Sequence, residues 1–486
     1  MKKTKNLPNI LLILTDQHRY DSVGINGNNI CKTPNLDNLA REGVRFEQAY
    51  TPCALCTPAR ASIFTGRYPH NHGLWNNCDM FQYAKPELPD SEVLFNQILK
   101  KDKNYNCGYV GKWHIGTKRG PSFYGFEGTD FPGYGYAPKH KDYQDYLKSK
   151  GLKSPYEDKN IKNKLFGLGG KFLIGGTIPG PAEATVPSYL AQRSSEMIKK
   201  YSRDYNKKNK PFFITCSFWG PHEPYLVPEE LMSIINPEDI PEWGNFRDKF
   251  INKPEAHKKF AAEFWKLNLG WKKWRKIVAL YWAHVYLVDM QIGRILKTLD
   301  ECGLKENTQV VFTTDHGDMV GAHAGIFDKG PFMYEETYRI PMIMRWPGRI
   351  KEGQVSDKLV SLLDLAPTFL AIAGIKSKTT EKMDGKNLLP LVTSKKTKWR
   401  DSVVAESHGH HALLSQRMIR WNKYKYVFSP YTTDELYDLK KDPYELTNLV
   451  QNKKYRNLIR NMKKKLSLWM NETKDPIRAS SNIYLS

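Results

Sequence analysis

Four short, continuous apolar runs constrain the fold of this 486-residue chain more than any other feature. They are NILLIL before TDQH, YNCGYV before GKWH, PFFITCSFW before GPHEP, and TQVVFT before TDHGD. Apolar runs of this length, separated by helical stretches and ended by polar turns, are typical of buried strands in a parallel sheet. The sequence therefore predicts an α/β fold with a large, mostly parallel sheet flanked by helices.

Helical periodicity fills the gaps between these runs. Apolar residues recur at helical spacing over residues 33–42, 186–201 and about 272–301. Near residues 395–400 the sequence becomes basic and polar, and alternating runs follow in RMIRWNKYKYVFSP and ELYDL. We predict a large domain over residues 1–395 and a subdomain over 396–486 with a small antiparallel sheet and a terminal helix around 453–469.

Polar residues follow each apolar run, at the point where the predicted strand ends. Ligands bind outside the carboxyl ends of the strands in sheets of this kind, so the fold would gather side chains that are far apart in the sequence. The residues brought to that edge are Asp16, Lys112, His114, His222, Asp315 and His316.

The segment LCTPARASIFTGRYPHNHG places Cys56 at the start of a predicted helix. We expect Thr57 as its N-cap, Pro58 as its first residue and Gly66 at its end. Free backbone N–H groups at a helix N-terminus favour an anion and lower the pKa of a thiol. Arg60 would add a fixed positive charge that binds the same anion or holds the loop.

Three interpretations of Cys56 follow from the residues alone. A buried structural cysteine is the ordinary one. Cys53 and Cys56 have the spacing of half a zinc or redox site, although no second pair with metal-ligand spacing follows in the sequence. The third interpretation is a modified catalytic residue.

The pattern CTPAR, from Cys56 to Arg60, resembles the CxPxR motif of type I sulfatases, in which the cysteine is oxidised to formylglycine. Similar segments follow the family order along nearly the whole chain: TDQ, TPNLDNLA, TGRYPHNHG, GKWHIG, GPHEPY, TTDHGD, FDKG, YRIPMIMRWPG and ELYDLKKDPYE. The resemblance implies the alkaline phosphatase superfamily fold, with residues 1–395 as the catalytic domain. It also implies an enzyme that hydrolyses sulfate monoesters.

The resemblance implies a divalent cation beside the modified cysteine. Calcium is our first expectation, and manganese, magnesium and zinc stay open, because this chain has one glutamine and one histidine where many sulfatases have Asp and Asn. The ligands that match the family are Asp16, Gln17, Cys56, Asp315 and His316.

The resemblance also implies catalytic roles. Lys112 and His114 match the family's Lys-x-His pair, His222 matches a histidine near the leaving group, and Lys329 matches a lysine that holds the sulfate. With Cys56 and Arg60, these are the predicted catalytic residues. Ala59 replaces a common serine of the motif, and the modification implies a formylglycine-generating maturation enzyme as a partner.

Two segments are candidates for substrate contact. Residues 124–143 combine aromatic residues, glycines and lysines in a long loop, which would suit a sulfated saccharide or would pack on its own tyrosines. The HGHH segment at 408–411 offers His408 and His410 as substrate-binding residues at the pocket rim, or as a weak surface metal site.

The net charge bears on which partners the protein could bind, and the cysteine content bears on the redox state of its cellular compartment. The chain has 74 lysines and arginines against 51 aspartates and glutamates, an excess of +23 that attracts polyanions or reflects a basic proteome. We expect no nucleic-acid partner. The seven cysteines are scattered and do not form a disulfide pattern, which favours a reducing compartment.

The N-terminal sequence is basic, but its apolar run is short and no cleavage site follows it. We therefore expect a cytoplasmic protein, or a periplasmic or secreted one if a signal has been removed. No stretch approaches the roughly 20 apolar residues of a membrane span.

Two other functions stay open. Within the same superfamily, the Asp-Gln and Asp-His pairs also resemble the choline sulfatase and phosphonate monoester hydrolase or phosphodiesterase branch. From another class, an inactive polyanion-binding protein would suit the charge.

Overall fold

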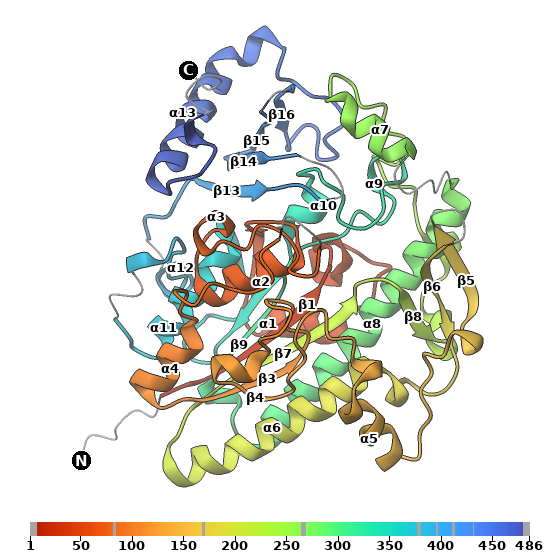
Figure 1. The fold of residues 1–486 in the computed structure, drawn as a ribbon, viewed down its shortest axis with the longest axis vertical. Coiled ribbons are helices and arrows are strands. Elements are labelled where there is room, and N and C mark those ends of the chain that lie inside the picture. The colour runs from red at the N-terminus through yellow and green to blue at the C-terminus, as the bar shows by residue number, and fades with distance from the viewer. Residues whose placement is uncertain are drawn as a thin grey trace.

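The computed structural model describes residues 7–80, 84–167, 171–263, 269–376, 381–394, 397–410, 414–430 and 432–479. Within these residues, nine strands form a central mixed sheet in the order β10-β2-β11-β9-β1-β7-β3-β4, and β12 pairs with β2 (Figure 1). The strands are β1 (Asn9–Asp16), β2 (Val44–Tyr50), β3 (Asn106–Gly111), β4 (Glu127–Gly128), β7 (Phe212–Pro221), β9 (Thr308–Thr314), β10 (Arg339–Ile340), β11 (Met342–Arg345) and β12 (Gln354–Ser361).

The four predicted strands are β1, β3, β7 and β9, and they lie side by side. β1 pairs in parallel with β7 and β9, and β3 pairs in parallel with β7. Their carboxyl ends therefore meet at one edge of the sheet, as predicted. β11 is antiparallel to both β2 and β9, so the sheet is mostly parallel rather than wholly so.

Helices cover both faces of the sheet. Side chains of a strand alternate between the two faces, and in β1 the side chains on both faces are apolar and buried. Ile10, Leu12 and Leu14 of β1 are buried in one cluster with residues of α2 (Cys56–Thr65), α4 (Phe95–Lys103) and α11 (Leu365–Ile372). Leu11 and Ile13 are buried on the other face with residues of α1 (Pro34–Arg41), α6 (Val186–Lys208) and α8 (Trp271–Glu301). Burial on both faces explains why this strand is a continuous apolar run in the sequence.

The helix bounds are α1 (Pro34–Arg41), α2 (Cys56–Thr65), α3 (Pro69–His72), α4 (Phe95–Lys103), α5 (Lys141–Ser149), α6 (Val186–Lys208), α7 (Glu255–Glu263), α8 (Trp271–Glu301), α9 (Ala322–Gly325), α10 (Glu335–Tyr338), α11 (Leu365–Ile372), α12 (Leu389–Thr393) and α13 (Arg456–Glu472). None of the helices in the described part of the chain is both long enough and apolar enough to cross a bilayer.

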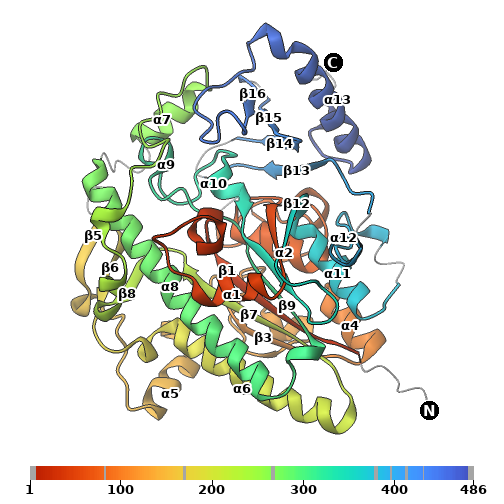
Figure 2. The same ribbon diagram turned by 180° about the vertical axis from the view of Figure 1, so that it is seen from behind.

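Two smaller sheets accompany the central one. β5 (Lys162–Gly167), β6 (Phe172–Ile178) and β8 (Tyr225–Pro228) form a three-stranded sheet beside α8. β13 (Ser402–Ser407), β14 (Gln416–Trp421), β15 (Tyr424–Phe428) and β16 (Glu435–Asp438) form an antiparallel sheet that, with α13, occupies one end of the molecule (Figures 1 and 2).

The C-terminal sheet confirms the antiparallel sheet expected after residue 395, and β13 is an addition to the predicted strands. It packs against the main body, since Val403, Met418 and Val427 share a buried cluster with Tyr50 and Tyr338. The boundary between residues 395 and 396 stays a prediction, and both residues lie outside the described ranges.

The start of α2 differs from the prediction. The helix begins at Cys56, with Leu55 in the N-cap position, so the expected capping role of Thr57 and the expected start at Pro58 are both wrong. The Thr57 hydroxyl instead donates a hydrogen bond to the backbone carbonyl of His114 at 2.7 Å, which ties the helix to the loop after β3. The predicted end is confirmed, because Gly66 adopts the left-handed conformation with φ of 69°.

A buried carboxylate on α8 holds the start of α1. Asp289 accepts hydrogen bonds from the backbone N–H groups of Asn35 and Leu36, at 3.1 and 2.8 Å. Burial nevertheless raises the pKa of Asp289 to about 6. The ionised carboxylate is therefore less favourable in the folded chain than in the unfolded one.

We expect an Asp289→Asn variant to lose this pH dependence. A raised folded-state pKa gives stability that is complete at low pH and lost as pH rises through about 6. The free energy of unfolding of the native protein, relative to Asp289→Asn, should fall by up to about 2–3 kcal/mol between pH 4 and pH 7.5. Urea unfolding of both proteins across this range measures the difference, and a constant difference would contradict the assignment.

Candidate active site

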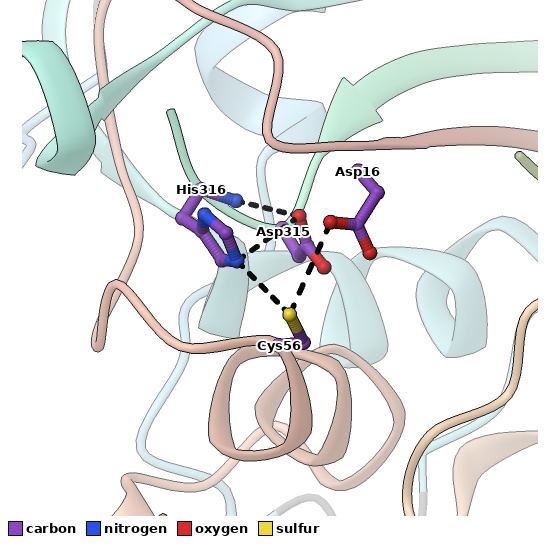
Figure 3. Close-up of side chains that lie close together, drawn as sticks. All are labelled: Asp16, Cys56, Asp315 and His316. Atoms are coloured by element: carbon purple, nitrogen blue, oxygen red, sulfur yellow. Dashed lines mark hydrogen bonds and ion pairs between the residues drawn. The ribbon is translucent and has the colours of Figure 1, made fainter. Parts of the chain in front are cut away.

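Four residues from distant segments meet at the carboxyl edge of the central sheet (Figure 3). Asp16 is the last residue of β1, Asp315 and His316 directly follow β9, and Cys56 is the first residue of α2. All four are buried, and one ligand atom from each lies within 4.8 Å of the others. The Cys56 Sγ is 3.9 Å from Asp16 Oδ1 and 3.3 Å from His316 Nε2.

Two buried cations hold the two carboxylates. Arg60 Nη2 lies 2.8 Å from Asp16 Oδ2, and Arg60 Nε lies 2.8 Å from Asp315 Oδ2. Lys112 Nζ lies 2.7 Å from Asp16 Oδ2. Burial alone would raise the pKa of Asp16, but the charges of Lys112 and Arg60 hold it well below its ordinary value.

The contacts of Arg60 distinguish between its two predicted roles. Its third guanidinium nitrogen, Nη1, donates to the Lys112 carbonyl and the Ser217 hydroxyl at 3.0 and 2.8 Å, and the side chain is fully buried. These contacts favour a positioning role over direct binding of a substrate anion.

The donor atoms around Cys56 fit a divalent cation. His316 Nδ1 lies 2.9 Å from the Gly317 carbonyl, which places its proton there and leaves Nε2 with a lone pair facing the cluster. Gln17 Oε1 is buried and has no hydrogen-bond partner among the described residues. Two carboxylates, an imidazole nitrogen and an amide oxygen form a mixed donor set of the kind that divalent metals accept.

The amide nitrogen of Gln17 faces a second group of carboxylates. Nε2 donates to Glu223 Oε2, Asp318 Oδ2 and Asp328 Oδ1 at 2.8, 2.8 and 3.0 Å. Burial and the nearby charge of Asp328 raise the pKa of Glu223 to about 8, so it is largely protonated at neutral pH. These bonds fix the orientation of the Gln17 amide.

Tyr134, from the loop predicted to contact substrate, lies between the catalytic candidates. Its ring centroid is 4.2 Å from Lys112 Nζ, which in turn lies 3.7 Å from Cys56 Sγ. The rings of His114 and His222 each lie 5.6 Å from that of Tyr134. The structure thus brings Lys112, His114 and His222 together around one half-buried tyrosine.

The two histidines have different hydrogen-bond partners. His114 Nε2 lies 3.1 Å from Asp79 Oδ1, and its Nδ1 is buried without a hydrogen-bond partner in the described part of the chain. An Nε2–H that donates to the carboxylate leaves the His114 Nδ1 as a proton acceptor.

His222 adjoins the predicted sulfate-holding lysine. Its Nδ1 lies 2.7 Å from the Glu223 carbonyl, and its Nε2 lies 3.3 Å from Lys329 Nζ. Burial, with the charges of Lys329 and Lys112, lowers the pKa of His222 well below its ordinary value. The Lys329 ammonium therefore serves as the proton donor within this pair.

The C-terminal sheet contributes the two predicted rim histidines. His408 Nε2 lies 3.2 Å from Glu406 Oε1, and its ring stacks on Trp75 at 5.0 Å. His410 is buried close to Asp328. Burial would raise the pKa of Asp328, but the charges of Lys329 and His410 lower that pKa. His411, the last residue of HGHH, lies outside the described residues.

Sequence reasoning missed several residues of this site. Three adjoin predicted ones or share their motifs: Glu223 follows His222, Asp328 precedes Lys329, and Asp318 lies in TTDHGD. The other missed residues carry no motif and are identified only by their contacts: Trp75, Asn77 and Asp79.

Comparison with known proteins supports the same family along the chain. The family model described as Sulfatase matches residues 8–375. The model described as N-sulphoglucosamine sulphohydrolase, C-terminal, matches residues 321–472. The two matches together span the central sheet and the C-terminal sheet.

Individual relatives agree with the family match. An arylsulfatase of Clostridium perfringens is 31% identical over 478 residues, covering 94% of this chain and 93% of the relative. An N-acetylglucosamine-6-O-sulfatase of Bacteroides thetaiotaomicron is 26% identical over 519 residues, covering 93% and 84%. The structure of a phosphonate monoester hydrolase of Agrobacterium radiobacter shares the fold with a TM-score of 0.75, at 24% identity and 96% coverage of both chains. This chain therefore belongs to the sulfatase family of sulfuric ester hydrolases, within the alkaline phosphatase superfamily.

Proposed function

We propose that this protein hydrolyses the sulfate monoester of a sulfated saccharide, with formylglycine at position 56 and a bound divalent cation. The observation that carries the proposal is the place of Cys56. Its Sγ lies among the side chains of Asp16, His316 and Lys112, at the carboxyl ends of the parallel strands.

The cation would be held by Asp16, Gln17, Asp315 and His316 beside position 56, with calcium as the first choice. When bound, it would supply positive charge that favours a deprotonated hydroxyl on the hydrated aldehyde. Oxidation of Cys56 to the aldehyde requires a separate maturation enzyme.

The hydrated aldehyde has two hydroxyls, which would act in succession. One attacks the sulfur of the ester, while Lys112 and Lys329 neutralise charge on the sulfuryl oxygens. His222, protonated when the anionic ester is bound, gives that proton to the departing alcohol and is left as neutral imidazole. His114 Nδ1 then accepts the proton of the second hydroxyl, so that sulfate is released and the aldehyde returns.

Two observations support a saccharide as the alcohol part of the ester. One relative is named for action on N-acetylglucosamine 6-O-sulfate groups. The site also has aromatic rings at its margin, since Trp75 stacks on His408 and Tyr134 lies beside Lys112. Aromatic faces with nearby polar groups suit a ring that has both C–H faces and hydroxyl edges.

The test uses protein produced together with a maturation enzyme. We expect the tryptic peptide 46–60 to lose about 18 Da, the difference between a thiol and an aldehyde at one side chain. A Cys53→Ser variant is the matched control, since it has the neighbouring cysteine removed and should show the same loss. An unshifted peptide, under conditions that convert a control CxPxR protein, would contradict the proposed nucleophile.

The same protein then distinguishes the sulfatase from its rival of the same fold. We expect kcat/KM to be higher for 4-nitrophenyl sulfate than for 4-nitrophenyl phosphate or a phenylphosphonate ester. A clear preference for the phosphonate ester would instead assign phosphonate monoester hydrolysis, the named activity of one structural neighbour.

A further inference from the structure

The margin of the active site is built from residues that lie far apart in the sequence. On one side, Tyr134 lies between His114 and His222, and His222 contacts Lys329. His114 also contacts Asp79 of the other side. The other side is formed by residues 75–79 and the turn at 408–410, which follows β13. Trp75 is the one large apolar side chain of that second side with substantial exposure among the described residues, at 41%.

The two residues that follow Trp75 are hydrogen-bonded to parts of the site. Two residues later, Asn77 Oδ1 accepts a hydrogen bond from the Thr57 backbone N–H, directly after Cys56, at 3.0 Å. One residue later, Asn76 Nδ2 donates to the Gly409 carbonyl at 3.2 Å. The segment that carries the indole is therefore held between the first turn of α2 and the turn after β13.

One face of the indole is supported by a fixed ring. The imidazole of His408 stacks on it with ring centroids 5.0 Å apart and an interplanar angle of 17°. His408 is itself held by Glu406, which also accepts a hydrogen bond from the His70 backbone N–H at 2.7 Å. The indole is thus preorganised, and its exposed fraction belongs to the face and edge that His408 does not cover.

The surroundings of the exposed face define the ligand it would take. Asn76, the next residue, and Asp79, whose side chain is 44% exposed, provide hydrogen-bond donors and acceptors on the same segment as the indole. A flat apolar face bordered by hydrogen-bonding groups matches a pyranose ring, which has C–H faces and hydroxyl edges.

We propose that Trp75 is a sugar-stacking platform of this site, on which a pyranose ring of the substrate lies while its sulfate ester reaches position 56. The proposal rests on the proposed function and adds a specificity residue to it. His408 acts through Trp75, as the ring that holds the indole in place.

Binding in the absence of turnover tests the platform. The probe is glucosamine 6-sulfate, titrated by calorimetry into the full chain with Cys56→Ser as the parent. Adding Trp75→Ala should weaken binding by about tenfold, whereas Trp75→Phe should stay within about threefold because it keeps an aromatic face. Phe123→Ala is the matched control: Phe123 is 59% exposed and its ring contacts Arg119 and Tyr124, so affinity should not change.

Turnover by the matured protein separates the two proposals. Trp75→Ala should raise KM for the sulfated sugar and leave kcat within about twofold, as expected when uniform binding is lost. Three results would overturn the platform. The parent and Trp75→Ala could bind the sulfated sugar equally, or the parent could show no affinity for it. Trp75→Ala could also lose more affinity for choline sulfate than for the sulfated sugar. Absence of sulfate ester hydrolysis, with sugar affinity that still depends on Trp75, would overturn only the proposed function.

Discussion

Replacement of Cys56 by serine is expected to reduce turnover of 4-nitrophenyl sulfate by about 10³-fold or more, because the oxygen that attacks sulfur would then have no way to release sulfate. A serine side chain offers one hydroxyl, and sulfuryl transfer to it ends in a stable ester. The second hydroxyl of a hydrated aldehyde, deprotonated by His114, is what would break that ester. Initial rates of matured protein and of the variant measure the loss.

The control for this variant is structural. Cys56 is buried between α2 and the sheet edge, and serine differs from it by one atom, so the fold should be retained. We expect the midpoint of urea unfolding for Cys56→Ser to match that of Cys53→Ser, in which the other buried cysteine of the segment is changed. Multiple turnovers by a folded Cys56→Ser protein would contradict the aldehyde mechanism.

The sheet and its catalytic edge could be predicted because a strand that is buried on both faces requires apolar residues at consecutive positions. β1, β3, β7 and β9 are covered on both faces, so each is a continuous apolar run. The residue that follows such a run lies at the carboxyl end of a strand, which is why Asp16 and Asp315 meet although they are far apart in the chain.

The start of α2 shows the limit of local rules. Thr57 has a side chain that is typical of an N-cap, but its hydroxyl makes tertiary hydrogen bonds instead. It donates to the His114 carbonyl and accepts from the Cys78 backbone N–H. A local capping bond and a long-range one are similar in energy, so sequence alone could not rank them.

The margin of the site could be predicted only in part. An unusual cluster of histidines in the sequence predicts His408 and His410, and they lie where C-terminal residues reach the catalytic edge. Tyr134 lies in the aromatic-rich segment 124–143, whose composition makes it a candidate for substrate contact. Trp75 acts through contacts across loops, and a lone aromatic in a loop has no periodicity or spacing that identifies its partner.

Replacement of Arg60 by methionine should destabilise the protein by about 3–5 kcal/mol in the presence of a chelator, because it leaves Asp16 and Asp315 buried without the cation that bridges them. Methionine keeps much of the buried side-chain volume, so the loss reports on charge rather than on a cavity. Urea unfolding in EDTA measures it. Arg193→Met is the matched control: Arg193 and its partner Glu196 are both exposed on α6, so its loss should cost at most about 1 kcal/mol.

A divalent cation should then restore part of the stability lost in Arg60→Met. Because a cation that binds only the folded chain stabilises it by mass action, excess calcium or manganese should raise the unfolding free energy of both proteins, and more in the variant. The two carboxylates lack their guanidinium there, so each gains more from a cation between them. Equal stability of Arg60→Met and the native protein in EDTA would show that these carboxylates do not depend on Arg60. Failure of every divalent ion tested to stabilise either protein would remove Asp16 and Asp315 as metal ligands.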